Sequence, residues 1–305
     1  MSNVSQQLAS GALSGLATTV SLQPFDLLKT RMQQGGLPVS KHGRAHASTI
    51  LAISRNVVQA NGWKGLWRGT SASLYRNVPG VAMYMTSLTQ LRAFMAKSPS
   101  FATLQARKVA KDGSRSVLPT LTSTGNLVAG AIARVGIGFL LNPFSVLKAR
   151  YESNMYQYQS VGQGLQVIVK GGPSELFRGF LASAMRDAPH AGVFLVFYEH
   201  IKRDASQLFG AQTAVQSSAV HAFSAASAGA LATITTQPFD VIKTRIQVRP
   251  EGQYHSLLGT VRNIMLERGP LGFFDGASLR MSRKVLSSAI GWVVYEAVLM
   301  VWASS

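Results

Sequence analysis

The chain of 305 residues is 47% hydrophobic but only 14% charged, whereas soluble domains carry roughly one quarter charged residues. It has no Cys, which excludes disulfides and a Cys nucleophile, and its six His show no metal-binding spacing, so we expect no metal and no cofactor. The formal charge of +18 favours an anionic partner such as a lipid surface, nucleic acid or an anionic substrate.

Along the chain, the first predicted element is an apolar segment, 8–22, that is rich in small residues. Segment 1–7 before it has no basic region typical of a targeting peptide, so we expect targeting information to lie inside the chain. Segments of the same kind recur at 121–141 and 219–236. Small residues four apart let helices approach closely in a membrane, although tight packing in a soluble core uses the same pattern.

Each apolar segment leads into the same nine-residue pattern, which has a Pro in second place. The three copies are Gln23-Pro24-Phe25-Asp26-Leu27-Leu28-Lys29-Thr30-Arg31, Asn142-Pro143-Phe144-Ser145-Val146-Leu147-Lys148-Ala149-Arg150 and Gln237-Pro238-Phe239-Asp240-Val241-Ile242-Lys243-Thr244-Arg245. Two landmarks follow in each block, an aromatic residue two places before a Gly and then an Arg: Trp67, Gly69 and Arg76; Phe177, Gly179 and Arg186; Phe274, Gly276 and Arg283. Three landmarks in the same order in three blocks indicate an internal repeat.

Each block predicts a helix, a loop, a short amphipathic helix and a second long helix. The second long helices are expected at 70–95, 180–208 and 277–301, and the short helices at 48–59, 161–170 and 256–267. The predicted domains are a first repeat at 1–97, a basic linker at 98–118, a second repeat at 119–208 and a third at 215–303. We therefore predict an all-α membrane protein with six transmembrane helices in three pseudosymmetric pairs.

The charges of the repeated pattern lie at the end of a predicted membrane helix. Asp26 and Lys29 are three residues apart and share one helix face, as do Asp240 and Lys243. Charges in such positions face a bundle interior or water and usually pair. The pattern predicts a ring of inter-helix ion pairs at one end of the bundle, with interfacial side chains that extend to water as the alternative.

The pattern Pro-x-acid-x-x-base-x-Arg, followed by aromatic-x-Gly, resembles the signature of the mitochondrial carrier family over nearly the whole chain. The resemblance implies six tilted helices around a central cavity in the mitochondrial inner membrane, with both termini facing the intermembrane space. It also implies a monomer that transports a small metabolite by alternating access.

The resemblance further implies a salt-bridge network at the matrix side, the matrix gate. Its residues are Asp26, Lys29, Lys148, Asp240 and Lys243, with Gln33 and Gln247 as braces. Ser145 stands where the second repeat should have an acid, so at most two of three bridges can form. Glu152 occupies the second brace position.

A second network, the cytosolic gate, is implied by the family pattern aromatic-acid-x-x-base on the second helix of each repeat. Only Tyr198-Glu199-His200-Ile201-Lys202 matches it in full. Arg92 stands in a segment without the acid, and Glu296 in one without the base. We therefore expect the cytosolic gate to be weaker than the matrix gate.

The aromatic-x-Gly turns imply binding of cardiolipin phosphates, because helix N-termini attract anions. The residues concerned are Arg68, Gly69, Arg178, Gly179 and Gly276. Asp275 stands where a base is usual, which puts the third lipid site in doubt.

Arg76, Arg186 and Arg283 lie midway along the second helices, at positions that resemble the family's substrate contact points. An Arg in mid-membrane is costly, so a functional role is the default, with pairing to acids that hold the bundle as the alternative. An Arg can bind a carboxylate through two hydrogen bonds, and the adjacent Asp187 would accept from an ammonium group. The pair predicts a small zwitterionic substrate.

An Arg beside an acid at this position resembles the amino-acid branch of the family. The segments 186–192 and 148–153 resemble those of its glycine-transporting members, which implies glycine as the substrate, imported for 5-aminolevulinate and haem synthesis. Another amino acid or a keto acid is the alternative among carriers. A basic nucleic-acid-binding protein is the alternative from another class, but the sequence has no recognised binding module. An enzyme is not expected, because no Walker loop, G-x-S-x-G motif or catalytic cluster is present.

Overall fold

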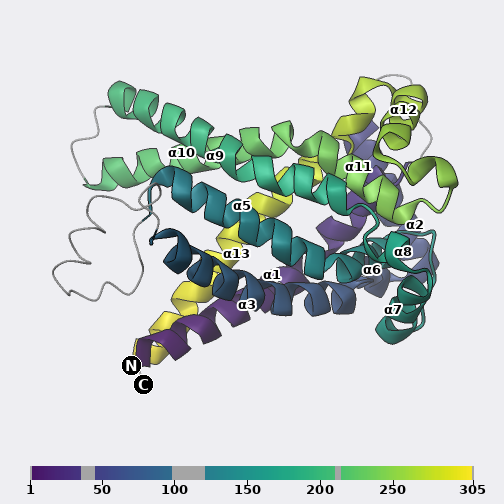
Figure 1. The fold of residues 1–305 in the computed structure, drawn as a ribbon, viewed down its shortest axis with the longest axis horizontal. Coiled ribbons are helices and arrows are strands. Elements are labelled where there is room, and N and C mark those ends of the chain that lie inside the picture. The colour runs from purple at the N-terminus through teal and green to yellow at the C-terminus, as the bar shows by residue number, and fades with distance from the viewer. Residues whose placement is uncertain (1, 36–44, 98–120, 210–213, 304–305) are drawn as a thin grey trace. The chain divides into compact units, whose positions relative to one another are not determined.

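The protein is seen in a computed structural model that describes residues 2–35, 45–97, 121–209 and 214–303 (Figure 1). The long helices of the repeats are α1 (Ser2–Gln33), α3 (Thr70–Met95), α5 (Ser123–Leu140), α6 (Asn142–Glu152), α9 (Phe180–Phe209), α10 (Ala214–Thr235), α11 (Gln237–Val248) and α13 (Ala277–Ala303). The connecting elements are α2 (Ala45–Asn61), η1 (Trp63–Trp67), α7 (Val161–Lys170), α8 (Pro173–Leu176), η2 (Gly252–Tyr254), α12 (Leu257–Arg268) and η3 (Pro270–Phe274). The predicted basic linker lies outside the described residues.

The predicted second helices and short helices are confirmed to within one helical turn. The second helices are α3, α9 and α13, and the short ones are α2, α7 and α12. Two of the short helices begin at a Ser whose hydroxyl accepts a backbone N–H: Ser160 before α7 and Ser256 before α12. Such N-caps satisfy donors that have no partner in the first helical turn.

The first helix of each repeat differs between repeats at its Pro. Pro24 lies inside the continuous helix α1, whereas the helix is interrupted at Leu141 before Pro143 and at Thr236 before Pro238. In the two interrupted repeats the Pro opens a new helix, where its missing N–H removes no helical hydrogen bond. The helix is therefore broken before the Pro in the second and third repeats only.

The amide residue before each Pro ties the helix to the aromatic-x-Gly turn of its own repeat. The bonds run from Gln23 Nε2 to the Arg68 carbonyl (3.1 Å), from Asn142 Nδ2 to the Arg178 carbonyl (3.3 Å) and from Gln237 Nε2 to the Asp275 carbonyl (2.9 Å). Buried amide groups need partners, so these three bonds fix where each repeat closes on itself.

On length and hydropathy, no single helix of the described chain qualifies as a membrane span, and one broken pair, Thr124–Leu140 with Asn142–Glu152, qualifies jointly.

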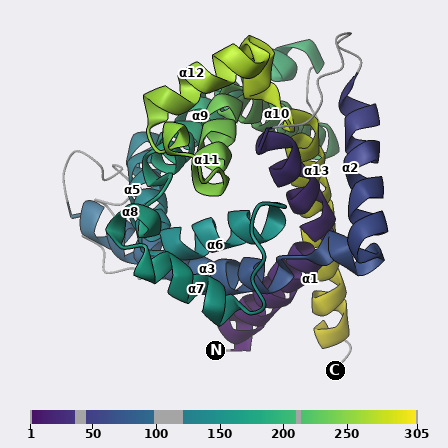
Figure 2. The ribbon, with the colours of Figure 1, turned by 90° about the vertical axis from the view of Figure 1, so that its right-hand side faces the viewer.

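The chain divides into two compact units, the first of which comprises Met1–Val78, Leu141–Ala182 and Gln237–Ser305. In this unit α2 packs against α1, α7 against α6, and α12 against α11. Figure 2 shows the three short helices on the outside and α1, α6 and α11 on the inside. The inner helices carry the residues of the predicted matrix gate.

The core of the first unit consists of three apolar clusters, one for each repeat. Each cluster joins the end of the inner helix to its short helix: Leu27 with Val57, Leu147 with Ile168, and Ile242 with Ile264. Each also contains one residue from the second helix of another repeat: Leu279 in the first cluster, Ala72 in the second and Ala182 in the third. The repeats are therefore held together in cyclic order by buried apolar surface.

The second unit comprises Pro79–Leu140 and Ser183–Thr236. The end of α3 packs on the start of α5 through a cluster around Met95, Leu121 and Ala129. A Cβ on Gly192 of α9 would lie 3.8 Å from Leu127 of α5, so these two helices also approach closely. His190 of α9 lies 3.3 Å from the Ala232 carbonyl of α10.

Candidate functional site

The first unit contains two inter-helix ion pairs of the predicted matrix gate. Lys29 Nζ of α1 lies 2.6 Å from Asp240 Oδ2 of α11, and Lys148 Nζ of α6 lies 2.6 Å from Asp26 Oδ2 of α1. Asp240 is only 1% exposed, so its charge depends on this pairing. At the third position of the ring, Ser145 of α6 has a hydroxyl group where the pattern would have a carboxylate.

The two predicted braces have different partners. Gln33 Nε2 donates to Asp240 Oδ2 at 3.0 Å, and Gln33 Oε1 accepts from the Thr244 hydroxyl at 2.7 Å. Gln33 thus supports the Lys29–Asp240 pair directly. Gln247 Nε2 instead donates to the backbone carbonyl of Arg178 at 3.3 Å, which joins α11 to the turn before α9.

Glu152, at the second brace position, adds a carboxylate to the gate. It lies 3.5 Å from Lys148 Nζ and accepts hydrogen bonds from the Thr30 hydroxyl (2.7 Å) and Gln23 Nε2 (3.2 Å). Lys148 therefore lies between Asp26 and Glu152, which distributes its single charge over two buried acids.

Arg283 is predicted as a substrate residue, but in the first unit it forms an ion pair with Asp26. The pair joins α13 to α1, so Asp26 has two cationic partners, Lys148 and Arg283. This matches the alternative in which a mid-membrane Arg pairs with an acid and holds helices together. The place of Arg283 along its helix can be predicted from the sequence. Its ion-pair partner depends on how the third and first repeats meet.

Arg76, the equivalent residue of the first repeat, donates from Nη1 to Asn77 Oδ1 at 3.2 Å. Asn77 Nδ2 in turn donates to the Thr19 hydroxyl at 3.3 Å, which joins α3 to α1.

In the second unit, Arg186 and Asp187 form a bidentate ion pair on α9. Arg186 Nε donates to Asp187 Oδ1 at 2.8 Å and Arg186 Nη2 donates to Asp187 Oδ2 at 3.1 Å. Both side chains are partly exposed, at 17% and 26%. The pair has no net charge and remains accessible to a ligand that can replace both contacts.

The residues of the predicted cytosolic gate are not joined to one another. Lys202 Nζ lies 5.9 Å from the ring centroid of Tyr198 on its own helix, and Glu199 is exposed. Within the ranges the structure describes, no ion pair links Arg92, Glu199 and Lys202. The side chain of Glu296 lies outside the described part.

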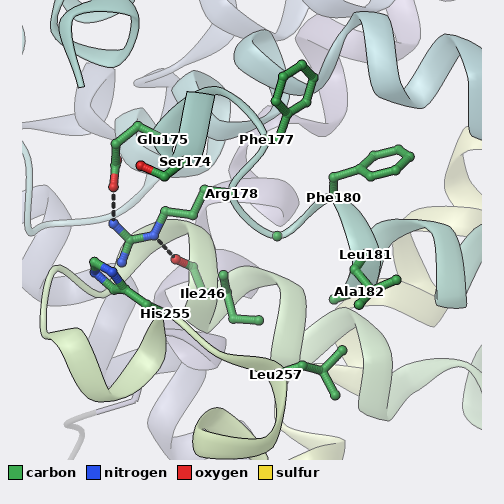
Figure 3. Close-up of a pocket in the computed structure, with 11 residues that line it drawn as sticks. Ser174, Glu175, Phe177, Arg178, Phe180, Leu181, Ala182, Ile246, His255 and Leu257 are labelled. Carbon is green, nitrogen blue, oxygen red and sulfur yellow. Dashed lines mark hydrogen bonds and ion pairs between the residues drawn. The ribbon is translucent and has the colours of Figure 1, made fainter. Parts of the chain in front are cut away.

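The predicted lipid turn at Phe177-Arg178-Gly179 borders a groove of about 250 Å³ in the first unit (Figure 3). The N-terminus of α9 at Phe180 and that of α12 at Leu257 both line this groove, together with His255. Gly179 has a φ of +70°, and an added Cβ would lie 2.9 Å from Gln247 Cγ, so this position requires Gly.

Arg178, which is predicted as a lipid-binding residue, donates to three protein groups. Its Nε donates to the Ile246 carbonyl at 2.5 Å, its Nη2 to the Arg249 carbonyl and its Nη1 to Glu175 Oε1 at 2.7 Å (Figure 3). Burial raises the pKa of Glu175, but the hydrogen bond from Arg150 and the charges of Arg150 and Arg178 lower it below its ordinary value. Arg178 therefore ties the second repeat to the end of α11.

The other two turns follow the same pattern with different partners. Arg68 Nη2 donates to the Tyr156 carbonyl at 2.5 Å, which ties the first repeat to the second. Asp275 is buried and accepts from Arg268 Nη1 at 2.7 Å. The charge at the middle position of each turn is thus held by protein groups in all three repeats.

We expect Arg178→Ala to lower the free energy of unfolding by about 3 kcal/mol, because it removes a buried cation and leaves two carbonyls without their donor and Glu175 with Arg150 as its remaining donor. Thermal denaturation of the purified protein, with and without cardiolipin, measures this. Lys170→Ala, which removes an exposed cation on α7, is the control and should leave the melting temperature unchanged. A loss of stability that occurs only when cardiolipin is present would instead make Arg178 a lipid ligand.

One threefold feature was missed by sequence reasoning, although the residues stand in the repeated pattern. The last Arg of each copy donates from Nε to a carbonyl at the end of the neighbouring inner helix: Arg31 to Glu152 (3.3 Å), Arg150 to Gln247 (3.3 Å) and Arg245 to Gln33 (3.2 Å). The recurrence of this Arg at the same place in all three copies was the signal that could have revealed its role. The acceptors are backbone groups of other repeats, and no sequence pattern identifies them.

The comparisons with known proteins agree with this threefold organisation. The family model described as mitochondrial carrier protein matches residues 1–99, 119–207 and 215–304. The chain is 64% identical to the mitochondrial glycine transporter of Laccaria bicolor over the full length of both chains. It is 41% identical to that of Emericella nidulans, over 95% of this chain and 86% of the relative, and 40% identical to that of Aspergillus niger, over 95% and 88%. Three matches that together cover nearly all of the chain establish that it belongs to the mitochondrial carrier family.

Proposed function

We propose that this carrier imports a small zwitterionic amino acid, glycine, into the mitochondrial matrix by alternating access. The observation that carries the proposal is the bidentate ion pair of Arg186 and Asp187, two neighbours about two turns into α9. In a membrane helix such charges mark a substrate pathway by default.

The pair favours a zwitterion over a keto acid on electrostatic grounds. A zwitterion offers its carboxylate to Arg186 and its ammonium to Asp187, so every charge keeps a partner. A keto acid has no ammonium and would leave Asp187 without a cation. Loss of one partner from a desolvated charge pair costs about 2 to 5 kcal/mol, which is enough for strong discrimination.

The names of the relatives support the same substrate, since all three compared here are called mitochondrial glycine transporters. As a member of its family the chain is a transporter and not an enzyme. Glycine delivered to the matrix would supply 5-aminolevulinate and haem synthesis.

Alternating access would use the two predicted gates in turn. The matrix pairs Lys29–Asp240 and Asp26–Lys148 are formed, while the cytosolic residues Glu199 and Lys202 are not paired with each other in the described chain. We infer that this conformation accepts substrate from the intermembrane space. Arg283 would act at the matrix side through Asp26, in addition to the substrate role expected for Arg76, Arg186 and Arg283.

Cardiolipin would bind in the groove of Figure 3 through helix N-termini rather than through Arg178. The ends of α9 and α12 that border the groove carry the partial positive charge of a helix N-terminus, which suits a phosphate. The turns at Gly69 and Gly276 would form the other two sites. The buried charge of Asp275 is compensated by Arg268, so it does not repel a phosphate at the third site.

The proposed location is the inner membrane, where the monomer would have both termini in the intermembrane space. Uptake of labelled glycine, other amino acids and keto acids into liposomes that contain the purified protein tests the function. We expect glycine uptake to exceed that of keto acids by tens-fold or more, as the electrostatic cost above implies. Equal uptake of glycine and a keto acid would refute the zwitterion assignment.

A further inference from the structure

A fourth Arg in the membrane-spanning part of the chain has no counterpart in the other repeats. Arg134 of α5 is the ninth residue before Pro143, and the ninth residues before Pro24 and Pro238 are Gly15 and Gly229. Since two repeats form the same helix with Gly at this position, the fold does not require an Arg. A residue such as Arg134, which is present in one repeat only, can bind one end of a substrate whose two ends differ.

Arg134 lies on the side of α5 opposite to its exposed apolar residues. Ile132 and Phe139 are 54% and 43% exposed, and they are two and five residues away from Arg134, which corresponds to about 200° and 140° around a helix. Charged side chains of membrane helices face the bundle interior or a water-filled cavity. The apolar residues therefore define the lipid side and Arg134 the inner side.

The guanidinium of Arg134 is held by an aromatic ring. Its Cζ lies 5.2 Å from the ring centroid of Tyr84 on α3, within the range of a cation–π contact. A Cβ on Gly130, one turn before Arg134, would lie 3.9 Å from the Tyr84 hydroxyl, so the ring lies against this face of α5. A Cβ on Gly138, one turn after, would meet nothing within 4 Å, which leaves space beside Arg134.

Arg134 differs from Arg186 and Arg283 because no acidic side chain of the described chain pairs with it. Those two pair with Asp187 and Asp26, whereas in the described part of the chain Arg134 has its cation–π contact and no ion pair. Arg134 is also exposed, so its guanidinium is accessible to an anion from outside the described chain.

Arg134 and Arg186 also lie at similar depth along neighbouring helices. Leu127 of α5 meets Gly192 of α9. Arg134 is seven residues beyond Leu127, about 10 Å along α5, and Arg186 is six residues before Gly192, about 9 Å along α9. Asn142, just after α5, bonds to the carbonyl of Arg178, just before α9. The end of α5 therefore lies beside the start of α9, and the two helices run in opposite directions. Both distances lead from the Leu127–Gly192 contact toward this shared end.

We propose that Arg134, positioned by Tyr84, is an additional binding residue for the carboxylate of the transported amino acid. The proposal rests on the proposed function, because it needs a substrate with a carboxylate. Arg134 offers a planar fork of donors that matches a carboxylate, and the Tyr84 ring fixes that fork before the substrate arrives. A carboxylate shared by Arg134 and Arg186 lets Asp187 keep one cation while it accepts the ammonium.

The test compares variants at both residues in liposomes. Arg134→Gly introduces the residue of the other two repeats, and we expect it to raise the KM for glycine about tenfold or more with little change in melting temperature. Arg134→Lys should recover part of this loss. Tyr84→Phe keeps the ring and should resemble the unmodified protein, whereas Tyr84→Leu should raise the KM.

A second readout is inhibition of glycine uptake by 2-aminoethanol, which has the ammonium but no carboxylate. The unmodified protein should prefer glycine strongly, and Arg134→Gly should lose most of that preference. An unchanged KM and preference in Arg134→Gly would overturn the inference, as would a lower melting temperature with an unchanged KM. If the unmodified protein prefers another amino acid, the same comparison is made with that acid. Only uptake confined to substrates without a carboxylate would overturn both proposals.

Discussion

Asp187→Asn is expected to abolish glycine uptake, with a decrease of tens- to thousands-fold, while the protein still folds and inserts. The substitution keeps the shape of the side chain but removes the charge that would hold the substrate's ammonium. It also leaves Arg186 without the anion that it contacts at 2.8 and 3.1 Å. Loss of one partner of a desolvated charge pair costs about 2 to 5 kcal/mol, which gives the stated range. Initial rates of uptake into liposomes measure the effect.

The same helix provides a matched control. Arg203 and Asp204 are also adjacent residues of opposite charge on α9, but their side chains are 66% and 62% exposed. Exposed ion pairs contribute little, so Asp204→Asn should leave glycine uptake close to that of the unmodified protein. Glycine uptake by Asp187→Asn equal to that of Asp204→Asn would exclude Asp187 from substrate binding.

Reversal of one charge in the matrix gate should impair transport strongly, and the cognate double reversal should restore part of it. Asp240→Lys places two ammonium groups together at a site where the native carboxylate is 1% exposed, and Lys29→Asp places two carboxylates there. A buried pair that loses one partner is destabilised by about 3 to 5 kcal/mol, enough to reduce uptake more than tenfold. The combination of Lys29→Asp with Asp240→Lys restores opposite charges, and uptake should recover partly because Gln33 supports only the native arrangement.

A double variant with the wrong partner controls for the change in net charge. Asp240→Lys combined with Lys148→Asp also leaves the net charge unaltered, but Lys148 pairs with Asp26 rather than Asp240. We expect no recovery from this combination. If it recovers as well as the cognate swap does, net charge rather than the Lys29–Asp240 contact controls transport.

The sequence alone was sufficient to predict the three repeats and their helices. The second helices begin within a residue of their predicted starts because each follows a Gly turn. The Gly turn and the helical pattern after it are both local in the chain. A ring of inter-helix ion pairs also follows from sequence, because an acid and a base three residues apart can serve two neighbouring helices of a ring.

Only the tertiary structure decided which residues of different repeats meet. Arg283 contacts Asp26, Arg178 bonds to carbonyls at the end of α11, and Arg134 lies against Tyr84. Each of these contacts joins segments far apart in the chain, and those of Arg178 use backbone carbonyls, which every residue possesses. A sequence pattern identifies which side chain is charged and which helix face it occupies. Its partner is fixed by how apolar clusters pack one repeat against the next, as Leu279, Ala72 and Ala182 do, and that packing is a property of the folded chain.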